Sequence, residues 1–478
     1  MRKVLIVTLP VLLAACGRAP STTEASNLPT APPAIASNPP QTYAPVVKRV
    51  APAVVTVRSA RRARPAQQYP FQNDPFFRWF FGESAGPSSG QQQVEHALGS
   101  GVIVESDGHI LTNQHVIDGA QEIHVDLTDG RNFTAKVIGE DKLSDLAVLK
   151  IDANNLPVLY LADSDKVQVG DVCLAVGNPL AVGETVTSGI ISAKGRYTGL
   201  SNGSFEDFLQ TDAPINQGNS GGALVNTNGE LVGINSQILS TTGGFIGIGF
   251  AIPSNMAKNV MMQLIKTGKV ERGQLGVTAQ QLTPDLAQSL GLQNVHGVVI
   301  SQVEPGSAAD KAGLKTGDVI TQLNGKPVED PNSFRNAIAG TAPGAQVTLT
   351  YLRDGRQQQT TATLQELKPE QNGAQPAQQQ PSRGELGLQV EPMTPSLAQQ
   401  LNLPANTQGL AVAGVDPNGP AAEAGIQTGD VIVEVNRQPV KSVADLRSAL
   451  AKSGGRPALL LIDHGGQTLF VTVSPNAG

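Results

Sequence analysis

Residues 216–225 read NQGNSGGALV, and this stretch decides how the rest of the sequence is interpreted. Gly218, Gly221 and Gly222 surround Ser220, and a hydrophobic run follows directly. Glycine loses more backbone freedom on folding than any other residue, so three glycines here indicate a tight loop with positive φ or a close approach by another backbone. An ordinary Asn-Gly turn is the alternative. A serine in such a loop is a candidate nucleophile, provided that the rest of the chain supplies its partners.

The composition indicates a mainly β protein of several domains. The chain has 478 residues, of which 40% are hydrophobic, and this length predicts two to four domains. Aromatic residues make up only 4%, whereas there are 51 Gly and 33 Pro, which favours short strands joined by turns. The net charge is −6 and the basic residues form no stripe, so we expect no nucleic-acid partner.

The first 43 residues do not belong to the fold. Residues 1–15 have the pattern of a signal peptide, because a short basic start precedes an apolar run of about ten residues, too short to span a bilayer. The run ends in LAAC (13–16), which resembles a bacterial lipobox and implies that Cys16 is lipidated. Ordinary secretion with an incidental cysteine is the alternative. Gly17 follows where an inner-membrane lipoprotein usually has Asp, which favours the outer membrane.

Residues 16–43 are rich in Pro, Ser, Thr and Ala, a composition typical of a disordered tether. If Cys16 carries lipid, Cys173 has no disulfide partner. Cys173 lies in the apolar run DVCLAVG and is expected to be an inert core thiol.

Short alternating apolar segments fill residues 44–270 and predict a barrel or sandwich domain. A helix is expected over 255–267, with Ser254 as its N-cap and Gly268 after its end. The predicted strands are 53–59, 99–106, 122–127, 146–151, 230–239 and 247–253. Residues 61–97 are too long and polar for a simple hairpin turn. Their centre, DPFFRWFFG (74–82), is either a functional loop or a locally packed cluster.

The last third of the chain repeats itself. Residues 304–328 match residues 416–440, and RGQLGV (272–277) matches RGELGL (383–388). The period of roughly 110 residues is too long for a solenoid, so two copies of one domain are expected. We place these copies at 271–367 and 383–475, joined by a low-complexity linker at 368–382.

A nucleophilic serine needs a base, and the base needs an orienting acid. His115 stands in ILTNQHVIDGA, where an apolar strand ends and the chain turns. Asp145 directly precedes the apolar strand LAVLKI, at the mouth of the core. Each has a structural alternative, since a lone His is more often structural and an Asp often caps a turn. The order His115, Asp145, Ser220 is nevertheless the one found in chymotrypsin-like β-barrels.

The motifs LTNQHV, SDLAVLKI and GNSGGALVN together resemble the HtrA family of envelope serine proteases, in its DegP and DegQ branch. The resemblance covers roughly residues 44–475. It implies a chymotrypsin-like double β-barrel protease domain at 44–270 followed by two PDZ domains. It also implies that His115, Asp145 and Ser220 are catalytic and that the amides of Gly218 and Ser220 form the oxyanion hole. No metal or cofactor is implied. Gln114 departs from the family, which often has Asn there.

The resemblance also suggests contact residues. Residues 238–250 resemble the wall of the family's first substrate pocket, and the apolar Ile238, Leu239 and Ile248 predict cleavage after small aliphatic residues. In the two PDZ copies, the peptide-binding stretch matches Leu275-Gly276 and Leu386-Gly387. A C-terminal peptide would add there as a strand. Alternatively, one copy, more plausibly the second, serves assembly.

These features together predict a periplasmic, membrane-tethered endopeptidase that degrades unfolded proteins. Its partners would be unfolded polypeptides and C-terminal peptides, and the resemblance implies trimers or multiples of trimers. One alternative is a chaperone whose holding function outweighs cleavage. Another is a site-specific regulatory protease, although such relatives usually have one PDZ domain and a membrane helix.

Overall fold

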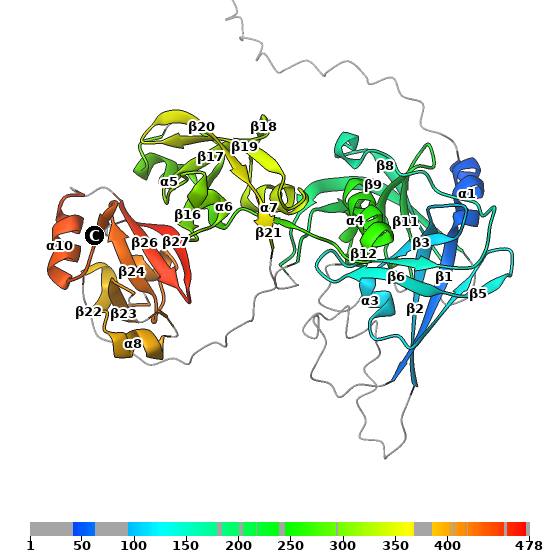
Figure 1. Ribbon diagram of the computed structural model, residues 1–478, viewed down its shortest axis with the longest axis horizontal. Helices are drawn as coiled ribbons and strands as arrows, with labels where there is room; N and C mark the ends of the chain where they lie inside the picture. Colours follow the sequence, from blue (N-terminus) through cyan, green and yellow to red (C-terminus); the bar gives the residue numbers. More distant parts are fainter. Residues whose placement is uncertain are drawn as a thin grey trace, which may run out of the picture. The chain divides into compact units, whose positions relative to one another are not determined.

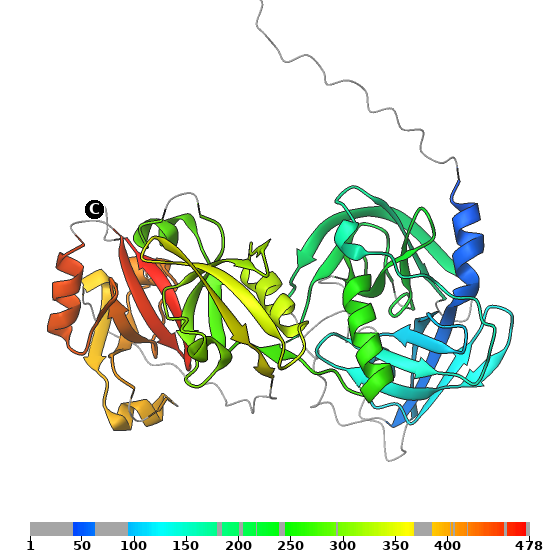
Figure 2. The ribbon, with the colours of Figure 1, turned by 45° about the horizontal axis from the view of Figure 1, so that its top comes forward.

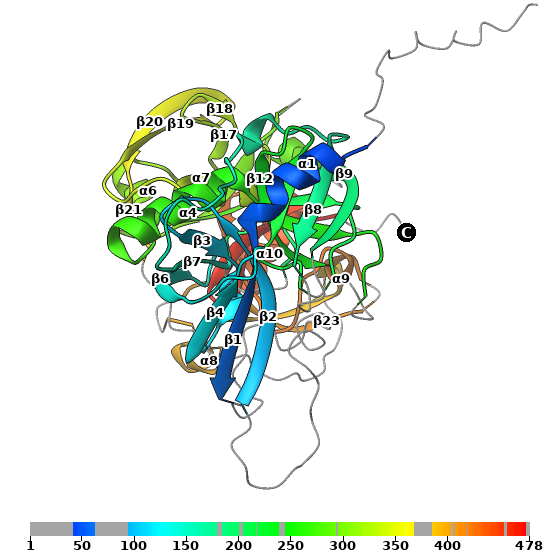
Figure 3. The same cartoon turned by 90° about the vertical axis from the view of Figure 1, so that its right-hand side faces the viewer.

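A computed structural model describes most of the chain from Thr42 to Ser474. Figures 1, 2 and 3 show its helices and strands from three directions. The described residues are 42–62, 94–178, 184–199, 204–216, 218–238, 244–292, 295–367, 385–401, 403–404, 407–417, 419–453 and 457–474. The following predictions lie outside them: the signal peptide, Cys16, nearly all of the tether, the aromatic stretch 74–82, Leu239 and the linker 368–382.

The first sheet follows a short helix α1 (Ala44–Val50) and a 3-10 turn η1 (Ala51–Ala53). Its seven strands lie in the order β5-β4-β1-β2-β3-β7-β6 and pair antiparallel. β1 and β2 form the long ribbon that projects in Figure 3. Val54, Val55 and Val57 of β1 and Val102 and Ile103 of β2 are buried in the core. The strands are β1 (Val54–Arg62), β2 (Val94–Ile103), β3 (His109–Thr112), β4 (Glu122–Asp126), β5 (Asn132–Thr134), β6 (Lys136–Asp141) and β7 (Leu146–Lys150).

The next six strands close into a barrel in the order β10-β13-β12-β11-β8-β9. Cys173 lies on β8 and is buried with a free thiol, and burial raises the pKa of that thiol to about 11. A 3-10 turn η2 (Ser164–Lys166) precedes the barrel. The strands are β8 (Val172–Gly177), β9 (Thr185–Arg196), β10 (Phe208–Thr211), β11 (Ala223–Asn226), β12 (Leu231–Ile238) and β13 (Gly249–Pro253).

Helix α4 (Ser254–Thr267) joins the first sheet to the barrel, because it contacts β6 and β7 as well as β12 and β13 (Figure 2). Gly268 ends it with φ of 74°, as expected for a glycine C-cap. The predicted N-cap is wrong. Pro253 occupies the cap position, and the Ser254 hydroxyl instead donates to the backbone oxygen of Ala162 at 2.7 Å.

The first repeat, residues 271–367, folds around its own core of sixteen buried residues, among them Ile300, Phe334 and Leu349. Its sheet has the order β15-β16-β17-β19-β20, with β18 on β17 and a separate pair β14·β21. Its elements are β14 (Gly273–Gln274), β15 (Val277–Gln281), α5 (Pro284–Ser289), β16 (Val298–Val303), α6 (Ala308–Lys311), β17 (Val319–Leu323), β18 (Lys326–Pro327), α7 (Pro331–Ala339), β19 (Gln346–Arg353), β20 (Arg356–Thr363) and β21 (Gln365–Glu366).

The second repeat, residues 383–475, has the same sheet order, β22-β23-β24-β26-β27 with β25 on β24, so the internal sequence match reflects two copies of one fold. Its core includes Leu410, Ile432 and Leu460. Its elements are η4 (Glu385–Gly387), β22 (Leu388–Pro392), α8 (Pro395–Gln400), β23 (Leu410–Val415), α9 (Pro420–Glu423), β24 (Val431–Val435), β25 (Gln438–Pro439), α10 (Val443–Ala451), β26 (Ala458–His464) and β27 (Gln467–Val473). Within the described residues, no helix is long and apolar enough to cross a membrane.

Candidate active site

His115 and Asp145 form a close pair between the first sheet and the barrel. His115 lies on the short helix α3 (Gln114–Ile117), which follows β3, and its residue is 2% exposed. Its Nδ1 lies 2.9 Å from Oδ1 and 2.8 Å from Oδ2 of Asp145, and its backbone N–H donates to Oδ1 at 3.0 Å. The carboxylate therefore fixes both the ring and the backbone of His115, with the Nδ1 proton directed at Asp145.

Asp145 is held in an unusual backbone conformation. It has a φ of 54°, a left-handed value that Asp tolerates better than most residues. Its backbone oxygen accepts from the side-chain amide of Asn113 at 3.0 Å and from the backbone N–H of Gln114 at 3.2 Å. These bonds connect the turn before β7 to the start of α3, which explains how residues thirty positions apart meet.

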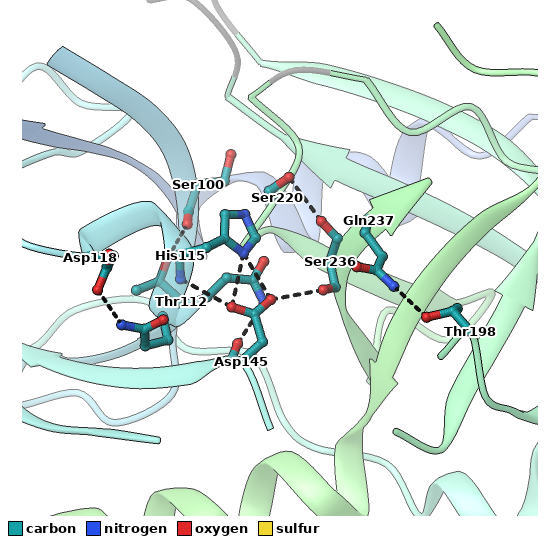
Figure 4. Close-up of polar contacts among 11 residues, drawn as sticks. Ser100, Thr112, His115, Asp118, Asp145, Thr198, Ser220, Ser236 and Gln237 are labelled. Carbon is teal, nitrogen blue, oxygen red and sulfur yellow. Dashed lines mark hydrogen bonds and ion pairs between the residues drawn. The ribbon is translucent and has the colours of Figure 1, made fainter. Parts of the chain in front are cut away.

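Ser220 lies in the glycine-rich loop before β11 and is fully buried. Figure 4 shows the imidazole ring of His115 between the carboxylate of Asp145 and the side chain of Ser220. Gly218 and Gly221 have φ of 96° and 81°, so the loop needs the left-handed backbone that the sequence predicted. A Cβ on Gly222 would lie 2.4 Å from the backbone oxygen of Val176, which is the predicted close approach.

Ser236 completes the cluster and was not identified from the sequence. Its hydroxyl donates to Oδ2 of Asp145 at 2.9 Å, and its backbone oxygen accepts from the Ser220 hydroxyl at 3.0 Å (Figure 4). The available signal was the polar triplet Asn235-Ser236-Gln237 inside a strand, β12, whose eight residues are all buried. Buried polar side chains need hydrogen-bond partners, so such a triplet marks a functional or structural network.

Gln114 makes bonds that the sequence left undefined. Its side-chain amide donates to Oδ1 of Asp118 at 3.0 Å and to Oε2 of Glu140 at 3.3 Å. It therefore binds the carboxylate of Asp118, just after α3, and that of Glu140 on β6. The His115–Asp145 pair is intact although Gln114 departs from the family pattern.

The predicted pocket residues are only partly placed. Ile238 ends β12 and is 1% exposed, whereas Ile248 directly precedes β13 and is half-buried. Since Ile238 pairs with Gly249, the two isoleucines lie at the same end of the β12–β13 hairpin. Leu239 lies outside the described residues. A cavity of about 300 Å³ beside Cys173 and Glu230 has none of the triad residues in its lining.

The predicted peptide-binding loops have related backbones. Gly276 and Gly387 have φ of 77° and 74°. Each glycine's carbonyl accepts a backbone hydrogen bond, from Glu304 and Asp416 respectively. The copies differ at the leucine, because Leu386 itself has φ of 59° and lies in η4. Both loops therefore present turned backbone beside the first strand of their sheet.

One group of potential metal ligands occurs among the described residues. Ligand atoms of Glu105 and Asp107, in the turn after β2, and of His109, the first residue of β3, lie within 4.8 Å of one another. His109 Nδ1 already contacts Glu105 at 2.9 Å and Asp107 at 2.8 Å, and both carboxylates are exposed. The three side chains of this cluster therefore already contact one another.

Comparison with protein families identifies three domains. The trypsin-like peptidase domain matches residues 99–234, and two PDZ domain families match residues 273–364 and 412–463. The predicted mainly β fold, a trypsin-like domain followed by two PDZ domains, is confirmed.

Known proteins match nearly the whole chain. The periplasmic serine endoprotease DegP of Escherichia coli is 43% identical over 453 residues, 90% of this chain and 91% of the relative. The periplasmic pH-dependent serine endoprotease DegQ of the same organism is 43% identical over 436 residues, 90% of each. A probable DegP-like protease of Chlamydia trachomatis is 44% identical over 87% of this chain and 83% of the relative.

Among solved structures, the HtrA-type protease AlgW with a decapeptide superposes with a TM-score of 0.54 at 44% identity. The superposition covers 69% of this chain and 100% of the AlgW chain. The three domains and the relatives that match nearly the whole chain lead to the same conclusion: this chain belongs to the HtrA family and is a periplasmic serine endopeptidase of the DegP and DegQ type.

Proposed function

We propose that Ser220, His115 and Asp145 act as the catalytic triad. The observation that carries this proposal is a hydrogen-bond network that links the three residues through Ser236. The Ser220 hydroxyl donates to the backbone oxygen of Ser236, the Ser236 hydroxyl donates to Asp145, and Asp145 contacts Nδ1 of His115. The Ser220 oxygen attacks the carbonyl carbon of a peptide bond while His115 Nε2 takes its proton. Asp145 holds the Nδ1 proton and stabilises the imidazolium.

The tetrahedral intermediate carries a negative oxygen, which the backbone N–H groups of Gly218 and Ser220 stabilise. It collapses when His115 returns the proton to the leaving amine, so the C–N bond breaks and an acyl-Ser220 ester remains. Water then attacks this ester by the same proton route and releases the new carboxyl end. Ser220→Ala and His115→Ala variants should each abolish cleavage of casein and of a quenched fluorescent peptide; retained cleavage in Ser220→Ala would refute the assignment.

The proposed physiological substrates are unfolded or damaged envelope proteins, cleaved after small aliphatic residues. The apolar Ile238 and Ile248 at the end of the β12–β13 hairpin support this preference, because neither can pair with a basic side chain. Matched peptides with Val, Ala, Lys or Phe before the cut test it, and fastest cleavage after Lys would contradict it. A holding activity is the second candidate, and Ser220→Ala that still suppresses aggregation of an unfolded protein would support it.

PDZ regulation is supported by side chains of α7 in the first PDZ domain. Asn332 and Asn336 donate to the backbone oxygen of Glu206 at 2.7 and 2.6 Å, just before β10 of the barrel. Peptide bound to the first PDZ domain would act on cleavage through this contact. Addition of a C-terminal peptide should therefore change kcat of the wild type, and a peptide that binds without changing kcat would contradict this regulation.

We further propose that Cys16 is lipidated and tethers the enzyme to the outer membrane, on the periplasmic side. Mass spectrometry of the mature N-terminus tests this, and an unlipidated start elsewhere would refute it. We also propose that the basic assembly is a trimer or a multiple of trimers. Light scattering after size-exclusion chromatography would contradict this with a monomeric mass.

A further inference from the structure

The glycine-rich loop packs directly against strand β2, and a single serine lies at the crossing. β2 contains Gly99-Ser100-Gly101, in which Ser100 is fully buried. A Cβ on Gly99 would lie 2.7 Å from the side chain of Val116, and one on Gly101 would lie 2.7 Å from Ile110. The two glycines therefore allow β2 to pack closely against its neighbours. Ser100 is the one residue of this tripeptide whose side chain can contact the glycine-rich loop.

Ser100 makes bonds with both residues whose amides are proposed to bind the oxyanion. Its hydroxyl donates to the backbone oxygen of Gly218 at 2.5 Å, and its backbone N–H donates to the backbone oxygen of Ser220 at 2.8 Å. The same hydroxyl accepts from the N–H of Asn178 at 2.9 Å. The Ser100 backbone oxygen accepts from the Thr112 hydroxyl at 2.7 Å, which fixes Ser100 in turn (Figure 4).

These bonds control peptide planes. The Gly218 carbonyl belongs to the plane before Asn219, and the Ser220 carbonyl belongs to the plane before Gly221. The N–H of Ser220 lies in the plane between them, whose Asn219 carbonyl accepts from Gly222 N–H at 2.9 Å. Each peptide plane is rigid, so bonds to all three of these planes restrict the direction in which the Ser220 N–H points.

From this geometry we infer that Ser100 is a positioning residue for the oxyanion hole: it holds the peptide planes on either side of the Ser220 N–H, so that this donor points at the developing charge. The bonds of Ser100 to the loop end on the backbone oxygens of Gly218 and Ser220, so its role there is to hold the backbone. It acts by preorganisation, which matters because donors that need no rearrangement stabilise the transition state most. The inference rests on the proposed role of the Gly218 and Ser220 amides.

The test compares Ser100→Ala with a matched control, Ser254→Ala. Ser254 is equally buried and its hydroxyl also donates to a backbone oxygen, that of Ala162, but it lies at the start of α4. Removing one oxyanion donor outright typically costs about 10²–10³-fold in kcat, so a misdirected donor should cost about 10–100-fold. We expect this loss in kcat of a fluorogenic peptide for Ser100→Ala, with KM within about twofold of wild type.

A transition-state readout separates positioning from general damage. The Ki of a peptide aldehyde, which forms a tetrahedral adduct with Ser220, should rise by the same factor as kcat falls. Ser100→Cys keeps the size of the side chain but has a weak donor, so it should also lose kcat, and it serves if Ser100→Ala fails to fold. The inference is overturned if these variants match Ser254→Ala in kcat, or if the loss lies in KM alone. Activity in Ser220→Ala would instead overturn the proposed triad, so the two failures are distinguishable.

Discussion

Replacing Asp145 by Asn removes a charge from the centre of the cluster and changes little else. Asn has nearly the same shape as Asp and tolerates the φ of 54° equally well, so the backbone of the turn should persist. The carboxylate has three donors directed at it, from His115 N–H, His115 Nδ1 and the Ser236 hydroxyl. The Asn side chain has only one oxygen, so its NH₂ group must take the place of either Oδ1 or Oδ2, both of which accept hydrogen bonds in the wild type.

The cost follows from where that NH₂ group would lie. If the amide oxygen keeps the Oδ1 position, the NH₂ lies 2.8 Å from Nδ1 of His115, and two donors oppose each other. The ring then favours the tautomer with its proton on Nε2, which cannot accept the Ser220 proton. A loss of about 10⁴-fold in kcat is expected for such a reversal, or roughly 5 kcal/mol of barrier at 1.36 kcal/mol per decade.

Steady-state kinetics on a fluorogenic peptide measures this loss, and circular dichroism verifies folding. Asp152→Asn is the matched control, because Asp152 is exposed just after β7 and should keep full activity when replaced. If Asp145→Asn retains more than about a tenth of the wild-type kcat, the carboxylate does not orient His115 and the reasoning fails.

Three further substitutions test the packing of the Ser220 loop, a buried ion pair and a buried carboxyl group. Gly221→Ala would put a Cβ 2.2 Å from a backbone oxygen of β2 at a φ of 81°, so kcat should fall at least about 100-fold. Gly130→Ala is the control: its φ is 89° but the space around it is open, so it should cost only about 1–2 kcal/mol of backbone strain in thermal unfolding. Equal kcat values for the two variants would contradict the packing argument. Arg272 makes a buried two-bond ion pair with Asp141, so Arg272→Ala should lower the free energy of unfolding by about 3–5 kcal/mol in denaturant titrations, and an unchanged midpoint would refute this. Burial and nearby carboxylates raise the pKa of Asp207 from 3.8 to about 6, so its contribution to stability is present below pH 4 and is lost as pH rises through 6. Asp207→Asn should therefore gain stability over wild type across pH 4–6, and parallel melting curves over that range would count against it.

Much of this architecture could be predicted from local sequence. Strands such as β4 appear where apolar and polar residues alternate, whereas β12 and β13 are buried along their whole length and appear as short apolar runs. The glycines beside Ser220 indicated positive φ, and Gly218 and Gly221 have it. His115 and Asp145 could be chosen because each stands where an apolar strand meets a turn.

The remaining features depend on tertiary contacts that no local pattern encodes. Ser236 lies 91 residues from Asp145, and Ser100 lies 118 residues from Gly218. Their partners are in part backbone oxygens, which every residue has, so the side-chain sequence gives no pairing signal. Ser254 shows the converse error, since its hydroxyl has the chemistry of an N-cap but finds a better partner across the fold at Ala162.

The central claim is that Ser220 is a nucleophile activated by His115, and a fluorophosphonate probe tests it most directly because it labels only an activated serine. Intact mass followed by peptide mapping should show a single adduct on Ser220 in the wild type, and labelling at least about 10³-fold slower in His115→Ala. An adduct on another residue, or rapid labelling of Ser220 without His115, would contradict the account.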